Sequence, residues 1–348
     1  NRRNWTFVYA DTLSYTLDKG QGRYRISIAG DKLISLSSYV HVPEEWERAY
    51  EDRQSKRSII RTIGSVFSII LLIAGMIWGI VRWTRKEFSV KIFLYFAIGL
   101  LGLFILDSFL TWDSVMFGYQ TSLPWSNFVT MFIVSMGIGG LFSSAGLGII
   151  GGMSVNLVPV KVSDKYNWLK AIGLALALFG LNALLSKFEI KTSPFWANFD
   201  ASNSRLPIIS TGIGDIQSFI GTTGILLILY FGLHTFTKQW SQSKWLFGGL
   251  TVLAGILIQA ASLDNYIFWI VSGLLTGLIL LGLYILFIRY HFEWIPVIAA
   301  VSVILGIVRN IIIGAVPSAL SGGIMGILII GLFGLYWYSE FVHTIKVK

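Results

Sequence analysis

Ionisable residues inside long apolar stretches are the positions in this sequence best suited to chemistry. Asp107 lies late in one such stretch, Asp215 lies early in another, and Arg309 is followed by Asn310 late in a third. Because a charge in hydrocarbon is costly, residues of this kind usually face a bundle interior or a polar cavity and pair with one another. Two interpretations follow: a structural Asp–Arg pair that fixes helix packing, which we predict between Asp215 and Arg309, or a polar pocket or ion path. We take these four residues as a candidate intramembrane polar site.

The other acid–base residues form no recognisable catalytic or metal-binding pattern. His41, His234, His291 and His343 lie at the ends of the apolar stretches or outside them, and no two have the i, i+4 spacing of metal ligands on one helix face. Glu44-Glu45 begins a charged helix, where acids complement the helix dipole. The sequence contains no cysteine, no Gly-x-Ser-x-Gly elbow and no phosphate-binding loop. We therefore assign no catalytic, cofactor-binding or metal-binding residue, and we expect no cofactor.

The composition indicates which solvent surrounds the chain. Of its 348 residues, 54% are hydrophobic and only 13% are charged, whereas a soluble domain has about 25% charged residues. A chain this apolar cannot cover a water-facing surface, so its main partner is predicted to be the lipid bilayer. The net charge of +9 is typical of basic loops that face anionic lipid, and we expect no nucleic-acid partner.

Nine apolar stretches are long enough to cross a bilayer, which takes about 20 residues. They lie near 62–82, 89–110, 126–150, 168–186, 208–234, 245–262, 266–288, 294–314 and 319–338, and the weakest are 168–186 and 245–262. Tryptophans such as Trp83 and Trp245 lie at predicted ends, as in an aromatic belt. The fold class predicted is an all-α polytopic membrane bundle of about nine transmembrane helices.

The first 42 residues have a different character. Tyr24, Ile26 and Ile28 alternate with polar residues, which is a strand pattern, and Gly30-Asp31 is a good two-residue hairpin turn. So few residues cannot form an independent core. We interpret residues 1–42 as the end of an extracytoplasmic β domain whose earlier part precedes Asn1. Residues 43–61 then form a charged juxtamembrane helix, and residues 62–348 form the transmembrane helical domain.

Pairs of glycines four residues apart predict close helix packing inside this bundle. They occur at Gly148/Gly152, Gly273/Gly277 and Gly322/Gly326. Small residues at this spacing lie on one helix face and let two backbones approach each other.

Parts of the sequence resemble a known bacterial family. They are residues 6–9 (Thr-Phe-Val-Tyr), 22–25 (Gly-Arg-Tyr-Arg), 30–33 (Gly-Asp-Lys-Leu) and 41–46 (His-Val-Pro-Glu-Glu-Trp), with Arg48, Tyr50 and Arg53. These resemble large multidomain members of the CPBP (CAAX protease and bacteriocin-processing, or Abi) family of intramembrane proteases. Residues 117–122 also resemble the loop after the second membrane helix of those proteins. The resemblance covers residues 5–130 and implies a periplasmic domain followed by a helical domain in the bacterial cytoplasmic (inner) membrane.

The catalytic motifs of that family are not found in this chain. The family has Glu-Glu-x-x-x-Arg in a membrane helix, then Phe-x-x-x-His, then a His followed four residues later by Asn or Asp. Here Ala49 stands at the offset of the Arg, Phe231 and His234 are only three residues apart, and Ile295 follows His291 by four. No Glu lies within the nine predicted stretches.

The resemblance together with these departures favours a non-catalytic scaffold or partner-binding subunit that acts with other membrane protein subunits. One alternative is an active glutamic-type CPBP intramembrane protease. Another is a transporter or channel, in which Asp107, Asp215 and Arg309 would line one water-filled cavity.

Loop charges predict the orientation of the chain. The loops on one side contain Arg82, Arg85, Lys86, Lys91, Lys161, Lys165, Lys170, Lys238, Lys244, Arg289, Lys346 and Lys348, whereas those on the other side contain Lys187, Lys191 and Arg205. Cytoplasmic loops carry the excess of Lys and Arg. We therefore expect the N-terminus outside and the C-terminus inside.

This orientation can be tested by labelling, because the chain has no native cysteine. A single cysteine at Ser122 should react with a membrane-impermeant thiol reagent added from outside, and one at Ser163 should be protected until the membrane is opened. The opposite pattern of labelling would reverse the predicted orientation.

Overall fold

The structure, a computed structural model, describes residues 3–12, 17, 20–154, 167–187, 203–262, 265–313 and 317–346. Lys161, Ser163, Lys165, Lys191 and Lys348, which were used in the prediction of orientation, lie outside the described residues. The chain divides into two compact units, residues 1–62 and residues 63–348.

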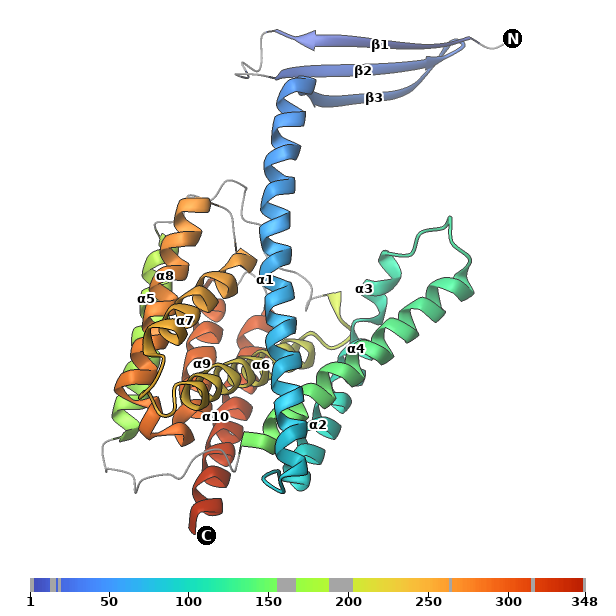
Figure 1. The fold of residues 1–348 in the computed structure, drawn as a ribbon. Helices are drawn as coiled ribbons and strands as arrows, with labels where there is room; N and C mark the ends of the chain where they lie inside the picture. The colour runs from blue at the N-terminus through green and yellow to red at the C-terminus, as the bar shows by residue number, and fades with distance from the viewer. Residues whose placement is uncertain are drawn as a thin grey trace. The chain divides into compact units, whose positions relative to one another are not determined.

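The first unit contains an antiparallel three-stranded sheet in the order β1-β2-β3 (Figure 1). The strands are β1 (Asn4–Asp11), β2 (Gln21–Ala29) and β3 (Lys32–His41). The hairpin predicted at Gly30-Asp31 is present, as the pairing of Ala29 with Lys32 shows. Gly30 has a φ of 65°, a left-handed conformation that glycine adopts without strain. Leu33, Ile34 and Leu36 are exposed, as expected for strands too few to enclose a core.

Helix α1 (Glu44–Thr84) is a single helix of 41 residues. It joins the predicted charged helix and the predicted first span without a break. Its acids come first, and i, i+4 ion pairs such as Arg48–Glu44 at 2.6 Å lie along its charged part. The border between the two units falls within it, after Thr62.

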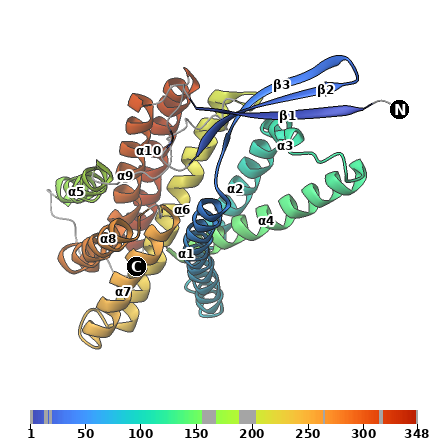
Figure 2. The same ribbon diagram turned by 90° about the horizontal axis from the view of Figure 1, so that it is seen from above.

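The second unit is a bundle of helices (Figures 1 and 2). After α1 it contains α2 (Val90–Leu110), α3 (Trp112–Phe117), α4 (Trp125–Ser154), α5 (Asn167–Lys187), α6 (Pro207–Phe236), α7 (Lys244–Ile258), α8 (Tyr266–Leu286), α9 (Ile295–Ile313) and α10 (Pro317–Lys346). Short 3-10 turns lie at Gln259–Ser262, Ile288–Tyr290 and Phe292–Trp294. Each of the nine predicted stretches overlaps one helix among α1, α2 and α4 to α10.

Among the described residues, seven helices are long and apolar enough to cross a membrane. The other two predicted spans contain shorter apolar helices, at Asn167–Leu181 and Lys244–Ile258, and they are the two that the sequence marks as weakest. The structure therefore supports a multi-pass membrane protein, while the count of nine stays a prediction.

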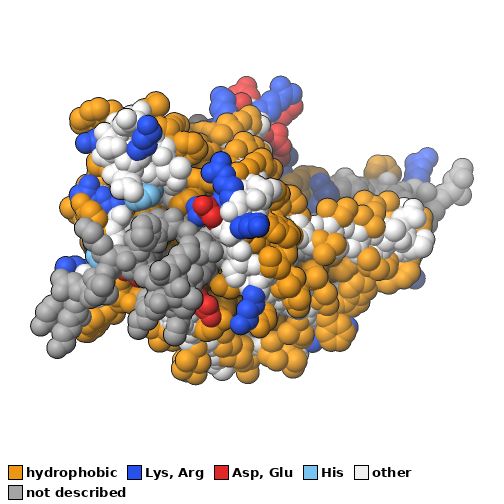
Figure 3. Space-filling view, turned by 60° about the horizontal axis from the view of Figure 1, so that its bottom comes forward, with side chains coloured by type: hydrophobic (Ala, Val, Ile, Leu, Met, Phe, Trp, Pro, Cys, Tyr) orange, Lys and Arg blue, Asp and Glu red, His pale blue; other side chains and the backbone are white. Residues whose placement is uncertain are grey.

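The surface of the bundle is apolar over wide areas. Ile98, Ile138 and Leu328 are each more than 60% exposed, although they lie within long apolar helices. Hydrophobic side chains cover most of the described surface turned forward in Figure 3. Soluble monomers rarely expose contiguous apolar patches of this extent, whereas lipid tails would cover such a surface.

Contacts between loops show which of them share an end of the bundle. The Ser89 amide donates to the Gly152 carbonyl at 3.0 Å, and Asn167 lies 3.3 Å from the ring of His291. At the opposite end, the Arg205 amide donates to the Leu110 carbonyl at 2.9 Å. We call the first of these the basic end, because residues 82–91, 237–244 and 287–294 meet there. Lys and Arg side chains are visible on this face in Figure 3. For the loops that the structure describes, the predicted grouping agrees with these contacts, and which end faces the cytoplasm stays a prediction.

Glycines hold the helices together in the predicted pairs. A Cβ on Gly277 would lie 2.6 Å from the backbone of Val252, and one on Gly273 would lie 2.6 Å from the backbone of Ile256, so α8 and α7 touch through their backbones. Gly322 approaches α6 at Thr211 in the same way, and Gly148 approaches α2 at Ala97. The small-residue pairs therefore serve packing within the bundle, as the sequence predicts.

Replacing Gly277 by leucine tests this packing. The side chain would collide with the backbone of α7, and forcing extra methylenes into a packed contact costs about 1–3 kcal/mol. Gly282→Leu is the matched control, since it lies on the same helix and a Cβ added there would meet nothing within 4 Å. Thermal unfolding in detergent should show a lower midpoint for Gly277→Leu alone. Equal midpoints for the two variants would contradict the role assigned to this glycine.

Candidate functional site

Asp107 contacts α6. The Ser210 hydroxyl donates to its Oδ1 at 3.3 Å, and this bond joins the end of α2 to the start of α6. Ser210 is buried and Asp107 is half-buried. A buried polar group needs a hydrogen-bond partner. The Ser210 hydroxyl and the Asp107 carboxylate supply each other with one, which is a structural role.

A charged pair lies close to Asp107, outside the membrane-spanning segments. Arg205 binds Asp113 through two hydrogen bonds, from Nε to Oδ2 at 2.9 Å and from Nη2 to Oδ1 at 3.0 Å. The same guanidinium lies over the ring of Phe109 at 5.0 Å. The hydrogen bond from Arg205 lowers the pKa of the Asp113 carboxyl. This pair fastens the segment before α6 to α3, and its exposure makes it a surface contact of small energy.

Asp215 and Arg309 do not form the predicted ion pair. Asp215 packs against Gly326 of α10, and its Oδ2 is buried without a hydrogen-bond partner among the described residues. Arg309 and Asn310 are exposed near the end of α9. Gly323, near the start of α10, touches Ile307 and Ile311 of α9. Arg309 and Asn310 therefore lie toward the end of the bundle opposite the basic end, where the sequence places them. No hydrogen bond or ion pair among the described residues joins any two of the four candidate residues.

The structure reveals a polar cluster that the sequence analysis missed. His291 Nδ1 lies 3.1 Å from Glu293 Oε1, and His291 Nε2 lies 3.3 Å from the Asn167 amide nitrogen. The Glu293 side chain is only 1% exposed. Its Oε2 and the Asn167 Oδ1 are buried and without a hydrogen-bond partner in the described part of the chain.

Glu293 lies one residue before the predicted stretch at 294–314, which contains no Glu, but the apolar segment in the structure starts earlier and includes it. That segment begins at Phe292 and contains α9. Two 3-10 turns carry the chain into the bundle before α9 begins, and for this reason Glu293 becomes buried although it precedes the helix. Next to Trp294, Glu293 has the sequence context of a residue at the membrane interface. Its burial becomes evident only in the structure, where Asn167 of α5 lies beside His291.

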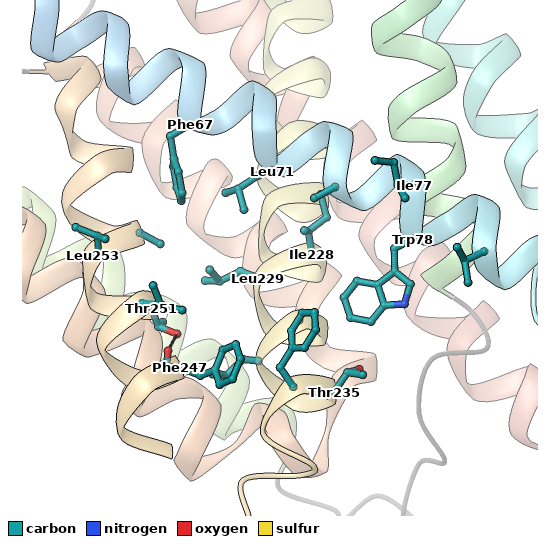
Figure 4. A pocket seen from close by; sticks show the side chains of 17 residues that line it. Phe67, Leu71, Ile77, Trp78, Ile228, Leu229, Thr235, Phe247, Thr251 and Leu253 are labelled. Atoms are coloured by element: carbon teal, nitrogen blue, oxygen red, sulfur yellow. Dashed lines mark hydrogen bonds between the residues drawn. The ribbon is translucent and has the colours of Figure 1, made fainter. Parts of the chain in front are cut away.

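An apolar groove of about 680 Å³ lies between α1, α6 and α7 (Figure 4). Phe67, Leu71 and Trp78 project into it from α1, and they face Leu229 of α6 and Phe247 of α7. None of the described residues that line it is ionisable. Of its polar groups, the Thr251 hydroxyl already donates to the Phe247 carbonyl at 2.8 Å. The groove lacks an acid or base, and it suits an apolar occupant.

Glycine and aromatic contacts lie along the walls of this groove. A Cβ on Gly64 would lie 2.7 Å from the Leu257 carbonyl oxygen at the end of α7, and one on Gly75 would lie 2.7 Å from Ile228 of α6. Between these contacts the longer side chains of α1 separate it from α7. Trp78 packs on Phe231 with ring centroids 4.3 Å apart, and Phe236 stacks on Phe247 at 5.4 Å. Helix α1 thus approaches α7 and α6 closely at these two glycines.

Comparisons with known proteins give no family for this chain. Neither protein-family models, nor curated proteins, nor solved structures match it. The geometry of the described residues is the basis for assigning a function.

Proposed function

We propose that this protein is a non-catalytic integral membrane subunit that binds an apolar partner in the groove between α1, α6 and α7. The groove is the observation that carries the proposal: its volume lies in the range of ligand sites, about 300–1,000 Å³, and its walls are mostly aromatic and aliphatic side chains. It opens among helices whose outer surfaces are themselves apolar. An occupant would reach it from within the bilayer.

The proposal includes a relationship to the CPBP proteases and a place in the bacterial cytoplasmic membrane. Support comes from the sequence resemblance over residues 5–130, and the observed hairpin of β2 and β3 followed by Pro43 and α1 has the order of elements that the resemblance implies. The missing motifs support a non-catalytic role. Hydrolysis needs a base within hydrogen-bond reach of a bound water, and the groove offers none.

The buried pair of His291 and Glu293 favours the protease as a second candidate. A carboxylate that contacts an imidazole is a common way to position a catalytic base. Here it is a single glutamate, and it is enclosed, so a substrate would reach it only after the basic end opens. The transporter alternative gains no such support, because Asp107 and Asp215 contact different helices and Arg309 is exposed.

Photocrosslinking and a peptidase assay together test the proposal. A photoreactive side chain at Leu250, which lines the groove, should capture a partner in membranes, and one at Leu246 should not. Both lie on α7 and are exposed, which makes Leu246 the matched control. The purified chain should show no turnover of membrane-helix or C-terminal peptides. Turnover that disappears in Glu293→Gln and His291→Ala would establish the protease instead, and equal capture at both positions would remove the groove as the binding site.

A further inference from the structure

The groove leads toward the basic end of the bundle. Its wall on α1 ends at Val81, directly before Arg82, and its wall on α6 ends at Phe236, two residues before Lys238. On α7 the wall begins at Phe247, three residues after Lys244. The three elements that form the groove therefore each place basic residues just beyond the same end of it.

The charges at this end are mainly positive. Arg85, Lys86, Lys238 and Lys244 are exposed. Glu87 is the acid that follows α1 here, and it contacts Arg82 at 3.0 Å, while the Arg82 guanidinium also lies over the ring of Phe231 at 5.1 Å. This acid is therefore engaged with one arginine, and four further bases face the solution or the headgroup layer.

The turn between α6 and α7 contains Lys238, and Lys244 begins α7 directly after it. Lys238, Gln239 and Trp240 all have positive φ angles, and the Thr237 hydroxyl accepts a hydrogen bond from the Trp240 amide at 2.9 Å. Trp245 is 95% exposed beside this turn, and Trp83 is 47% exposed at the end of α1. Exposed tryptophans at helix ends are typical of the headgroup level of a membrane.

Resting on the proposed function, we infer that the partner in the groove is an anionic phospholipid. An acyl chain occupies the apolar groove, and the phosphate lies among Arg85, Lys86, Lys238 and Lys244. Basic residues near a membrane surface attract anionic lipid by about 1 kcal/mol each, and the groove supplies the apolar contact that a diffuse basic surface lacks.

Charge favours a lipid over a transmembrane helix as the occupant. Membrane helices generally carry Lys and Arg at their cytoplasmic ends, and the predicted orientation places the basic end of this bundle on that side. A partner helix in the groove would then bring bases against bases. A phosphate at the same level is attracted by all of them.

Lipid binding by the purified full chain tests the inference. In mixed micelles, phosphatidylglycerol should bind more tightly than phosphatidylcholine, as measured by native mass spectrometry and by analysis of the lipid that co-purifies. Lys238→Gln with Lys244→Gln should weaken phosphatidylglycerol binding about tenfold or more. Lys91→Gln with Lys170→Gln removes the same charge from α2 and α5, which do not line the groove, and should leave binding unchanged.

Filling the groove is the second arm of the test. Ala74→Trp fills it from α1, and Leu250→Trp fills it from α7, so one variant remains if the other fails to fold. Each should lower phosphatidylglycerol binding about tenfold. Equal binding of the two lipids, or equal effects of the two lysine pairs, would overturn the inference.

A further outcome separates this inference from the proposed function. If a membrane protein co-purifies and is lost on filling the groove, while lipid binding is unchanged, the occupant is a partner helix, and the proposed function stands without the lipid. If filling the groove changes neither lipid nor protein binding, both fail.

Discussion

Close contact between helix backbones at glycine is the interaction on which this bundle depends. Lipid tails are as apolar as leucine, so burial of hydrocarbon contributes little to the association of helices in a membrane. How closely the helices pack therefore determines how stable their association is. Gly273 and Gly277 bring α8 onto α7, and Gly322 brings α10 onto α6. Helix α1 approaches its neighbours at Gly64 and Gly75, and the large side chains between those positions leave the groove. The candidate binding site is thus a consequence of where small residues are placed.

Polar groups in the bundle are paired locally. Asp107 receives a hydrogen bond from Ser210, and Glu293 contacts His291. The Asp107 contact joins α2 to α6, whereas the Glu293 contact lies within one short segment, and His291 in turn lies 3.3 Å from Asn167 of α5. In a low-dielectric interior an unpaired charge is costly, and short-range pairing is the simplest way to avoid it. Asp215 and Glu293 each keep one carboxylate oxygen that is buried without a hydrogen-bond partner in the part of the chain that the structure describes.

Much of the fold could be predicted from the sequence, because hydropathy and turn chemistry are local. The nine apolar stretches, the Gly30-Asp31 hairpin and the glycine pairs all correspond to observed features. The site could not be predicted in the same way. The proposed pairing of Asp215 with Arg309 assumed that two charges in apolar helices must meet, whereas the rotation of α9 leaves Arg309 exposed. The groove depends on the spacing of three helices, which no local pattern contains.

The central claim is that the space between α1, α6 and α7 is a binding groove rather than a gap that closes in the bilayer. Electron cryomicroscopy of the full chain in nanodiscs that contain both phosphatidylglycerol and phosphatidylcholine tests it most directly. The predicted result is elongated density along Leu71 and Leu229 that continues to headgroup density near Lys238 and Lys244. A map in which α1 packs directly against α7, with no space for an occupant, would contradict it.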